Sequence, residues 1–430
     1  MARRLRYFGT DGVRGVVGDD LTPDLVERVG KAATLWSSLR SSLGAGSGRV
    51  LVGRDTRASG PALEEALTRG IVSAGGTAVL GGVLPTPAVA LLAEELGAVV
   101  SASHNPPEYN GVKLFDGNGH KLTDEDEEAI ESLLDEPSRG GGAVEHRDGV
   151  GEAYLRHVVK HFGSDLSGLR VAVDCANGAY AELAPHAFRE LGGDVHTIGV
   201  DPDGTNINVG CGATDLVALS NKVVDSHCDL GIAFDGDGDR MLAVDERGRR
   251  LDGDQILAVL APALEVELVA VTVMTNLGFH RLMAEHGIRV VTTSVGDRHV
   301  LKALREEGGI LGGEQSGHIV WLRDHVTGDG LAAALLLCGA LAGRRLSEAA
   351  ATWTRYPQVQ KNVRVRSREL PAAILEEADG WSAELGDRGR VLVRPSGTEP
   401  VIRVLAEAET EEEAERVSAT IARLVEKELG

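Results

Sequence analysis

Short apolar segments alternate with segments of helical periodicity along most of this chain, and the alternation starts three times. The first round covers residues 49–101, the second residues 169–234 and the third residues 269–342. Strand-length apolar runs separated by helical segments are typical of an α/β layer with a mainly parallel sheet. The pattern therefore predicts three similar α/β domains with mixed, mainly parallel sheets, although their sequences differ too much to count as a repeat.

The individual elements follow from the same alternation. The expected strands are Arg49–Gly53, Thr77–Gly81, Ala98–Ser101, Leu169–Asp174, Asp194–Ile198, Leu230–Phe234, Val269–Met274, Arg289–Ser294 and Ile310–Gly313. The expected helices are Gly60–Gly75, Ala88–Leu96, Ala181–Leu191, Leu216–Asp225, Gly278–His286, Arg298–Glu307 and Gly330–Ala342.

The C-terminal part is organised differently. Two strands, Arg390–Val393 and Val401–Ala406, flank a loop, and a helix follows with Thr410 as its N-cap and Glu413 placed for a capping box. This part is expected to be a smaller α+β domain. Between the first two rounds, a segment rich in glycine and charge reads as a linker, residues 137–152. The expected domains are residues 1–150, 151–254, 255–360 and 361–430.

Composition excludes several kinds of partner. Lys and Arg total 44 and Asp and Glu 65, so the net charge is −21, and aromatic residues make up only 3%. Such a chain is a poor binder of nucleic acid or of acidic membranes. A local arginine cluster or a metal can still bind a small anion.

We expect a cytoplasmic protein with reduced thiols. The four cysteines form no CxxC pair, and the N-terminus lacks the apolar segment of a signal peptide. The longest apolar-rich segment, Leu331–Ala342, is too short to span a bilayer. No membrane partner is therefore expected.

The sharpest motif is Asp-Gly-Asp-Gly-Asp-Arg, which directly follows the apolar run Leu230–Phe234. The carboxylates of Asp235, Asp237 and Asp239 alternate with glycines and can converge on one hard cation. A solvated acidic turn is the alternative for a lone Asp-Gly-Asp. An EF-hand is excluded because Arg240 stands where that loop requires glycine. The motif therefore favours a metal site.

A second motif, Ser-Ala-Ser-His-Asn-Pro-Pro, begins at Ser101, where a predicted strand ends. Loops at the carboxyl ends of parallel strands are where α/β folds place ligands. A serine beside His104 is a candidate nucleophile or phosphate carrier, and a turn before proline is the alternative. Nearby Lys113 is a candidate acid/base or phosphate ligand, although most lysines simply lie on the surface.

The loop between the two C-terminal strands carries hydroxyls and arginines. It reads Arg-Pro-Ser-Gly-Thr-Glu-Pro from Arg394 to Pro400, and Arg403 lies three residues beyond. Two guanidinium groups and two hydroxyls around a glycine can form a phosphate cradle. A hairpin loop rich in Pro and Gly is the alternative.

Two further loops are weak signals by themselves. Gly312–His318 (GGEQSGH) holds a Glu, a hydroxyl and a His that suit recognition of a polyol, and Phe8–Gly15 (FGTDGVRG) carries Arg14. The serine, metal, polyol and phosphate loops fall in four different predicted domains, which suggests one central cleft. The residues alone thus point to metal-assisted phosphoryl chemistry on a phosphorylated polyol.

Together the motifs resemble those of the α-D-phosphohexomutase superfamily, over the whole chain and in the same order. By this resemblance Ser101–Pro106 is the phosphoserine loop, with Ser103 phosphorylated, and Asp235–Arg240 is the metal loop. Glu314–His318 and Arg394–Thr398 resemble the sugar-binding and phosphate-binding loops.

The chain is most similar to the bacterial phosphoglucosamine mutase branch. The segments that carry this similarity are Phe8–Gly15, Pro202–Asp215, Thr272–Gly278, Val295–Arg298 and Gly312–His318, together with Gln315. The resemblance implies interconversion of glucosamine 6-phosphate and glucosamine 1-phosphate, through a phosphoserine enzyme and a 1,6-bisphosphate. Such a reaction would supply amino-sugar precursors for the cell envelope. A phosphoglucomutase or phosphomannomutase is the alternative, and a non-catalytic hexose-phosphate-binding protein is a third.

The resemblance also implies roles for single residues. Mg²⁺ would be held by Asp235, Asp237, Asp239 and the phosphate on Ser103, with Arg240 beside it. Proton transfer would fall to Lys113 with Arg14 or His104. The sugar hydroxyls would meet Glu314 and Ser316, with His318 nearby. The distal phosphate would meet Arg394, Ser396, Gly397, Thr398 and Arg403. A sugar 1,6-bisphosphate would serve as activator, and a homodimer is implied.

Overall fold

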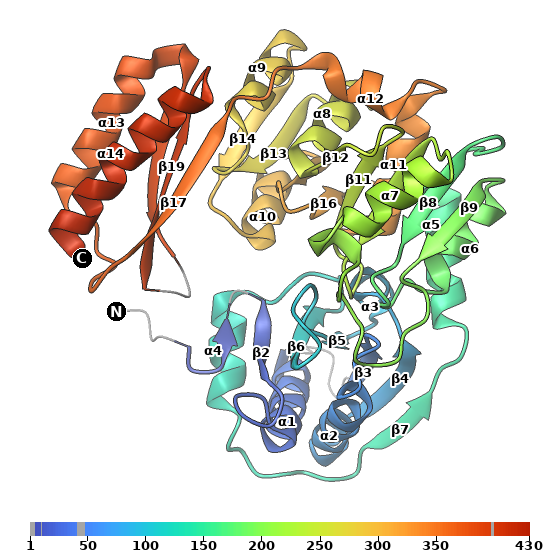
Figure 1. Cartoon of the computed structure of the whole chain (residues 1–430). Coiled ribbons are helices and arrows are strands. Elements are labelled where there is room, and N and C mark those ends of the chain that lie inside the picture. Colours follow the sequence, from blue (N-terminus) through green and yellow to red (C-terminus); the bar gives the residue numbers. More distant parts are fainter. Residues whose placement is uncertain (1–4, 10, 41–47, 397–399) are drawn as a thin grey trace. The chain divides into compact units, whose positions relative to one another are not determined.

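The computed structural model describes residues 5–9, 11–40, 48–396 and 400–430 (Figure 1). The chain forms two compact units. The first comprises Met1–Val273 and Ile288–Ala350, and the second comprises Met274–Gly287 and Ala351–Gly430. Three α/β layers lie in the first unit, and an antiparallel sheet with its helices lies in the second, as expected from the sequence.

The first layer is a seven-stranded mixed sheet with the order β1-β2-β6-β5-β3-β4-β7. Its strands are β1 (Phe8–Gly9), β2 (Gly12–Val16), β3 (Arg49–Arg54), β4 (Thr77–Val83), β5 (Leu96–Val100), β6 (Tyr109–Asp116) and β7 (Ala143–His146). The strands β5, β3, β4 and β7 run parallel, whereas β6 and β2 are antiparallel to their neighbours. One buried apolar cluster joins alternate residues of the central strands to α1 (Pro23–Arg40), α2 (Gly60–Ser73) and α4 (Asp124–Ser132), while α3 (Thr86–Leu92) packs on β3 and β5.

Two expectations for this layer were wrong. The expected linker contains β7, which pairs in parallel with β4, and helix α5 (Val150–Phe162) already begins inside it. Because β7 is short and mostly exposed, it carries no apolar periodicity, and pairing with the edge of β4 forms it instead. The helix expected to reach Leu96 ends at Leu92, because Leu96 pairs with Val50 as the first residue of β5.

The second and third layers follow the predicted alternation. The second sheet has the order β12-β11-β10-β8-β9, and the third has the order β14-β13-β15-β16. The second comprises β8 (Arg170–Asp174), β9 (Asp194–Ile198), β10 (Leu230–Phe234), β11 (Met241–Asp245) and β12 (Arg250–Leu251), with α6 (Leu183–Glu190), η1 (Gly212–Thr214) and α7 (Val217–Asp225). The third comprises β13 (Leu268–Thr272), β14 (Arg289–Thr293), β15 (Leu311–Gly313) and β16 (Ile319–Trp321), with α8 (Gly253–Ala263), α10 (Asp297–Glu307), α11 (Gly330–Leu341) and α12 (Leu346–Ala349).

Helix α11 is apolar on all sides because it is buried along most of its length. Its N-cap is Asp329, which accepts hydrogen bonds from the backbone N–H groups of Leu331 and Ala332. No single helix among the described residues is long and apolar enough to cross a membrane, and the helix pair that passes by length and composition is bent by 88°. All four cysteines are buried and free, as expected.

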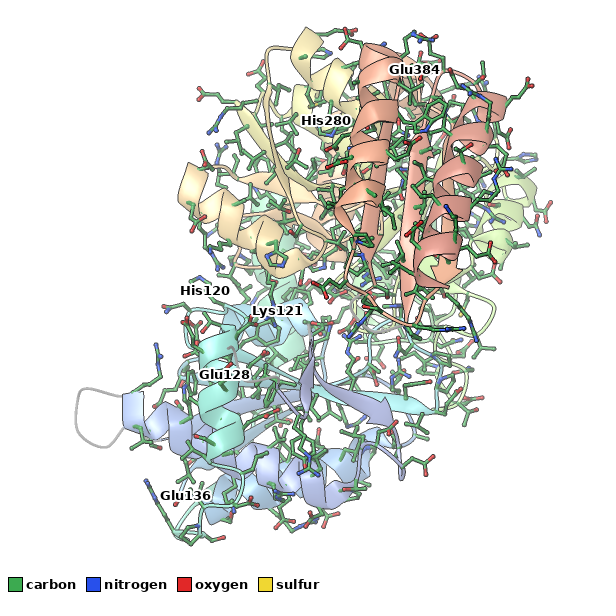
Figure 2. All side chains as sticks on the ribbon, turned by 90° about the vertical axis from the view of Figure 1, so that its left-hand side faces the viewer. His120, Lys121, Glu128, Glu136, His280 and Glu384 are labelled. Carbon is green, nitrogen blue, oxygen red and sulfur yellow. The ribbon has the colours of Figure 1, made fainter. Side chains whose placement is uncertain are left out.

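The second unit holds a three-stranded antiparallel sheet with the order β17-β19-β18. Its elements are β17 (Gln358–Arg364), β18 (Arg390–Pro395), β19 (Val401–Glu407), α9 (Leu277–Glu285), α13 (Ala372–Leu385), η3 (Gly386–Arg388) and α14 (Glu411–Leu429). The short η2 (Ala350–Thr352) begins at the last residue of the first unit. Figure 2 shows α13 and α14 side by side in front of the sheet. Their buried faces meet Ile402 and Val404 of β19. Thr410 caps α14 by accepting a hydrogen bond from the N–H of Glu413, as predicted.

Candidate active site

The three aspartates of the metal loop converge where β10 ends. One carboxylate oxygen from each of Asp235, Asp237 and Asp239 lies within 4.8 Å of the others, and all three residues are buried. The intervening glycines are required by close contacts. A Cβ on Gly238, whose φ is +76°, would lie 2.3 Å from the Tyr180 ring. Only glycine allows the loop to turn here and bring the carboxylates together.

The electrostatics of this loop favour a divalent cation. Burial, together with repulsion from Asp239 and Asp237, raises the pKa of Asp235 well above its usual range. The Oδ1 atoms of Asp237 and Asp239 are buried and accept no hydrogen bond from the part of the chain that the structure describes. Leaving such oxygens without a partner is costly, and a hard cation would satisfy them. The residues present therefore fit a Mg²⁺-type ion.

Ser103 lies directly against these carboxylates. Its Oγ donates a hydrogen bond of 2.5 Å to Oδ2 of Asp235 and lies 3.3 Å from Nδ1 of His104. The residue is 1% exposed and has a φ of +53°. The structure thus brings together the two motifs that the sequence singled out, the serine loop and the metal loop.

Lys113 reaches the same cluster from β6. Its Nζ lies 2.6 Å from Oδ2 of Asp237 and 2.8 Å from Oδ2 of Asp239. Burial alone would lower the pKa of Lys113, but the nearby carboxylates of Asp11, Asp237 and Asp239 outweigh it and hold that pKa well above its usual range. Lys113 is therefore a cation that partly neutralises the loop.

His104, unlike Lys113, is uncharged. Burial, together with the charges of Arg240 and Arg14, lowers the pKa of His104 to about 4. The imidazole is therefore neutral near pH 7.

Arg14 in β2 pairs with Asp11. The N–H of Arg240 donates to Oδ1 of Asp235 at 3.1 Å.

The polyol loop joins the same network through His318. Its Nδ1 lies 3.9 Å from Oδ1 of Asp239, and its Nε2 lies 3.6 Å from Oδ2 of Asp297. Glu314, four residues earlier, accepts hydrogen bonds from the N–H of Gly296 at 2.8 Å and the hydroxyl of Ser316 at 3.2 Å. The predicted sugar-binding residues therefore lie on one ordered turn between β15 and β16.

The predicted phosphate cradle lies in the second unit. Arg394 and Arg403 are register partners on β18 and β19, and Asn362 of β17 is the next partner in the row. Helices α13 and α14 pack against Val393 and Val404, which are the sequence neighbours of Arg394 and Arg403. Because successive side chains of a strand point to opposite faces, the two arginine side chains share the other face of the sheet. Paired arginines suit a dianion. Ser396 is buried beside them in the chain, and the predicted Gly397 and Thr398 lie outside the described residues.

Sequence reasoning missed several residues of the first unit that contact the predicted site residues or the partners of those residues. Lys121 donates to Oδ1 of Asp11 at 2.6 Å and also pairs with Asp297, and the hydroxyl of Thr86 donates to Oδ2 of Asp237 at 2.6 Å. No periodicity marks these positions.

A second missed group, Asp55 and Arg57, lies beneath the serine loop, where it contacts Ser101 and the carbonyl of Ser103. The sequence did contain a pattern from which this group could have been predicted. The charged run that follows β3 sits at the same carboxyl edge of the sheet as the serine loop.

The chain matches four models of one family in consecutive order. Phosphoglucomutase/phosphomannomutase α/β/α domain I matches residues 5–139, domain II residues 152–248, domain III residues 252–356 and the C-terminal domain residues 359–424. The matches cover nearly the whole chain in the expected order.

Full-length relatives carry a more specific name. The chain is 50% identical to a phosphoglucosamine mutase of Saccharopolyspora erythraea, over 98% of this chain and 99% of that protein. It is 44% identical to a phosphoglucosamine mutase of Bacillus subtilis, over 99% of both chains. A crystal structure of a phosphoglucomutase/phosphomannomutase family protein from Burkholderia thailandensis superposes with a TM-score of 0.84 at 25% identity, over 99% of this chain and 98% of that one.

Proposed function

The chain belongs to the phosphoglucomutase/phosphomannomutase family, in which it is similar to phosphoglucosamine mutases along its whole length, and we propose that it interconverts glucosamine 6-phosphate and glucosamine 1-phosphate. The enzyme is an isomerase that moves a phosphoryl group within one sugar, by way of a phosphoserine and a 1,6-bisphosphate. The observation that carries this proposal is the 2.5 Å contact between the Ser103 hydroxyl and Asp235 in a buried cluster of three carboxylates.

The metal site in this proposal consists of Asp235, Asp237 and Asp239, with the phosphate of Ser103 as a further ligand. Bound there, Mg²⁺ supplies positive charge that stabilises the phosphoryl oxygens during transfer. Arg240 and Lys113 add cationic charge from the protein itself. Lys113 is buried beside this loop, and the Arg240 side chain is 25% exposed. Phosphoryl transfer needs such charge neutralisation and in-line positioning more than covalent chemistry.

Two transfers complete the reaction. In the first, the bond from phosphorus to Ser103 Oγ breaks as a bond to the substrate hydroxyl oxygen forms, which gives the 1,6-bisphosphate. In the second, the other phosphoryl group moves from the sugar back to Ser103 Oγ. In the first transfer the substrate hydroxyl loses a proton and Ser103 Oγ gains one, and in the second the exchange is reversed. The neutral His104, 3.3 Å from Ser103 Oγ, carries this proton, while Lys113 and Arg14 balance charge.

The remaining loops bind the substrate. Glu314 and Ser316 bind the sugar hydroxyls, with His318 beside them. The distal phosphate is bound by Arg394, Ser396, Gly397, Thr398 and Arg403. Residues 1–150 thus supply the phosphoserine, 151–254 the metal site, 255–360 the sugar contacts and 361–430 the phosphate contacts. A homodimer and a cytoplasmic location belong to the same proposal, and the four free, buried cysteines fit that location.

The test is a comparison of initial rates on glucosamine 6-phosphate, glucose 1-phosphate and mannose 1-phosphate, with Mg²⁺ and a trace of sugar bisphosphate. A strong preference for glucosamine 6-phosphate is expected. Comparable or faster turnover of the plain hexose phosphates would move the specificity to the phosphoglucomutase or phosphomannomutase side of the family. No turnover of any of the three would refute the proposed activity.

A further inference from the structure

Ser103 has a backbone conformation that residues with a side chain rarely adopt. Its φ is +53°, in the left-handed region where a Cβ crowds the following carbonyl group. Such a conformation persists only where the surroundings fix it, and it is typical of functional sites. The surroundings of Ser103 therefore determine where its hydroxyl points.

A buried ion pair lies directly beneath the serine loop. Nε of Arg57 lies 2.9 Å from Oδ2 of Asp55, and both side chains are 0% exposed. The same Asp55 oxygen accepts a 2.6 Å hydrogen bond from the hydroxyl of Ser101. The Ser101 oxygen in turn accepts a 2.9 Å hydrogen bond from the N–H of Ser103. The amide of the nucleophile is thus held by a chain of three contacts.

The guanidinium of Arg57 holds the other side of the loop. Its Nη2 donates to the carbonyl oxygens of Ser103 and Asn105, both at 2.9 Å. Its Nη1 donates to the carbonyl oxygens of Pro106 and Tyr109, at 2.5 and 3.0 Å. A planar guanidinium can make this set of bonds, whereas a lysine ammonium lacks the fixed fork.

A side chain from the second layer completes the arrangement. Nδ2 of Asn208 donates to the carbonyl oxygen of Ser103 at 2.9 Å and to that of Asn105 at 3.2 Å. Asn208 lies on the loop that precedes η1 and contacts the serine loop from the side of the metal loop. The carbonyl oxygen of Ser103 is thus held by two donors, Arg57 from one layer and Asn208 from another.

We propose that four positioning residues fix Ser103 in its left-handed conformation and thereby set the rate of phosphoryl transfer to and from its hydroxyl. These residues are Asp55, Arg57, Ser101 and Asn208. This inference rests on the proposed function, because it assigns Ser103 the phosphoryl group. None of the four is required to touch the sugar. They act by keeping Ser103 Oγ beside Asp235, where a misplacement of about 1 Å can cost about a hundredfold in rate.

The most informative variant is Asn208→Gly. Asn208 itself has a φ of +60°, so glycine can keep its backbone conformation while the side chain that makes the two hydrogen bonds is removed. The control is His227→Gly, which also places glycine at a residue with left-handed backbone, here an exposed one with a φ of +51°. Both variants are compared with the wild-type enzyme for thermal unfolding, for kcat and KM on glucosamine 6-phosphate, and for the single-turnover rate of phosphoryl transfer from glucose 1,6-bisphosphate to dephosphorylated Ser103.

For Asn208→Gly we expect kcat and the transfer rate to fall about 10- to 100-fold, with KM changed less than about twofold. Asn208→Gly is expected to remain folded at the assay temperature, as is His227→Gly, which keeps the wild-type rates. A wild-type transfer rate in folded Asn208→Gly would overturn the inference. If the wild-type enzyme itself took up no phosphate, the proposed function would fail instead, so the two failures are distinguishable.

A second variant decides the matter if Asn208→Gly does not fold. Ser101→Ala removes one hydroxyl and leaves the volume nearly unchanged, so that the N–H of Ser103 loses its acceptor. The same loss of transfer rate at unchanged KM supports the inference, and a wild-type transfer rate overturns it. Arg57→Lys retains the positive charge but not the planar guanidinium group. It is expected to keep neither the wild-type transfer rate nor the full set of contacts to the carbonyl oxygens.

Discussion

The side chain of Lys113 joins the sheet that carries the serine loop to the metal loop, because its Nζ lies 2.6 Å from Oδ2 of Asp237. Lys113 is 2% exposed and Asp237 is fully buried, so the contact is protected from solvent. A lysine in this place has two effects. It stabilises carboxylates that would otherwise repel one another, and it competes with a cation for the same oxygens.

Replacing Lys113 by methionine separates these effects. Without added metal, Lys113→Met is expected to lose about 3 kcal/mol of unfolding free energy, because it leaves buried carboxylates without a counter-charge. The variant is also expected to bind Mg²⁺ more tightly than the wild-type enzyme. It is expected to turn over at least about a hundredfold more slowly, because it lacks a cation that balances the charge of the transferred phosphoryl group. Urea unfolding with and without Mg²⁺, calorimetric titration and kcat check the three parts. Weaker Mg²⁺ binding by a folded variant would contradict this assignment.

Asp237→Asn removes one charged ligand from the metal loop and keeps its shape. The Mg²⁺ concentration for half-maximal activity is expected to rise at least about tenfold, because Mg²⁺ is held mainly by carboxylate oxygens. Asp225→Asn, at an exposed acid that ends α7, is the control and is expected to respond to Mg²⁺ like the wild-type enzyme. An unchanged Mg²⁺ response of Asp237→Asn would show that this loop does not hold the metal.

The glycine at position 238 is tested by a matched pair of alanine variants. Gly238 and Gly82 both have a φ of +76°, but a Cβ on Gly238 would meet the Tyr180 ring at 2.3 Å, whereas a Cβ on Gly82 would meet nothing within 4 Å. Gly82→Ala is therefore expected to cost only the conformational strain, about 1 kcal/mol. Gly238→Ala is expected to cost at least about 2 kcal/mol more, measured by urea unfolding. Equal losses would mean that the Tyr180 contact is not a constraint.

A fourth test concerns the pH dependence of stability. Burial raises the pKa of Glu127 on α4 to about 7, and Arg298 of α10, 3.3 Å away, only partly opposes this. Between pH 4.5 and 7 the folded state therefore binds more protons at Glu127 than the unfolded state. The stability contributed by this raised pKa is present at low pH and lost as the pH rises through about 7.

Glu127→Gln removes this dependence. The wild-type protein is expected to lose stability relative to Glu127→Gln as the pH rises from about 4.5 to 7, and to level off above that, measured as the difference between their urea midpoints. Glu128→Gln, at the exposed neighbour that Figure 2 labels on α4, is the control and should follow the wild-type curve. Parallel curves for the wild-type protein and Glu127→Gln would contradict the raised pKa.

Local sequence patterns were sufficient to predict a strand, a turn or a helix cap where the residues of one segment determine it. The strand Leu230–Phe234 was predicted to the residue because its five residues are all buried, and the glycines at 236 and 238 marked the turn that follows. The same holds for the Thr410 cap. Strand β7 could not be predicted, since its partner β4 lies more than 60 residues earlier in the chain and supplies the pairing that forms it.

The features that the sequence did not predict depend on long-range contacts. Asp55 and Arg57 were missed because their partners, a hydroxyl for Asp55 and carbonyl groups for Arg57, lie 46 to 52 residues away. The grouping of α9 with the C-terminal sheet was also hidden in the sequence. Glu407, which is 0% exposed, accepts a hydrogen bond from the N–H of Leu277 at 3.1 Å, so the start of α9 is held by β19. Such pairings depend on the folded chain and leave no periodicity.

The central claim, phosphoryl transfer through Ser103, is tested most directly by the mass of the intact protein. The protein is measured after incubation with a sugar 1,6-bisphosphate and again after excess glucosamine 6-phosphate. An adduct of about 80 Da is expected on the intact wild-type protein, removed by the substrate as bisphosphate appears, and absent from folded Ser103→Ala. Turnover of glucosamine 6-phosphate without this adduct, or an undiminished adduct on Ser103→Ala, would contradict the assignment.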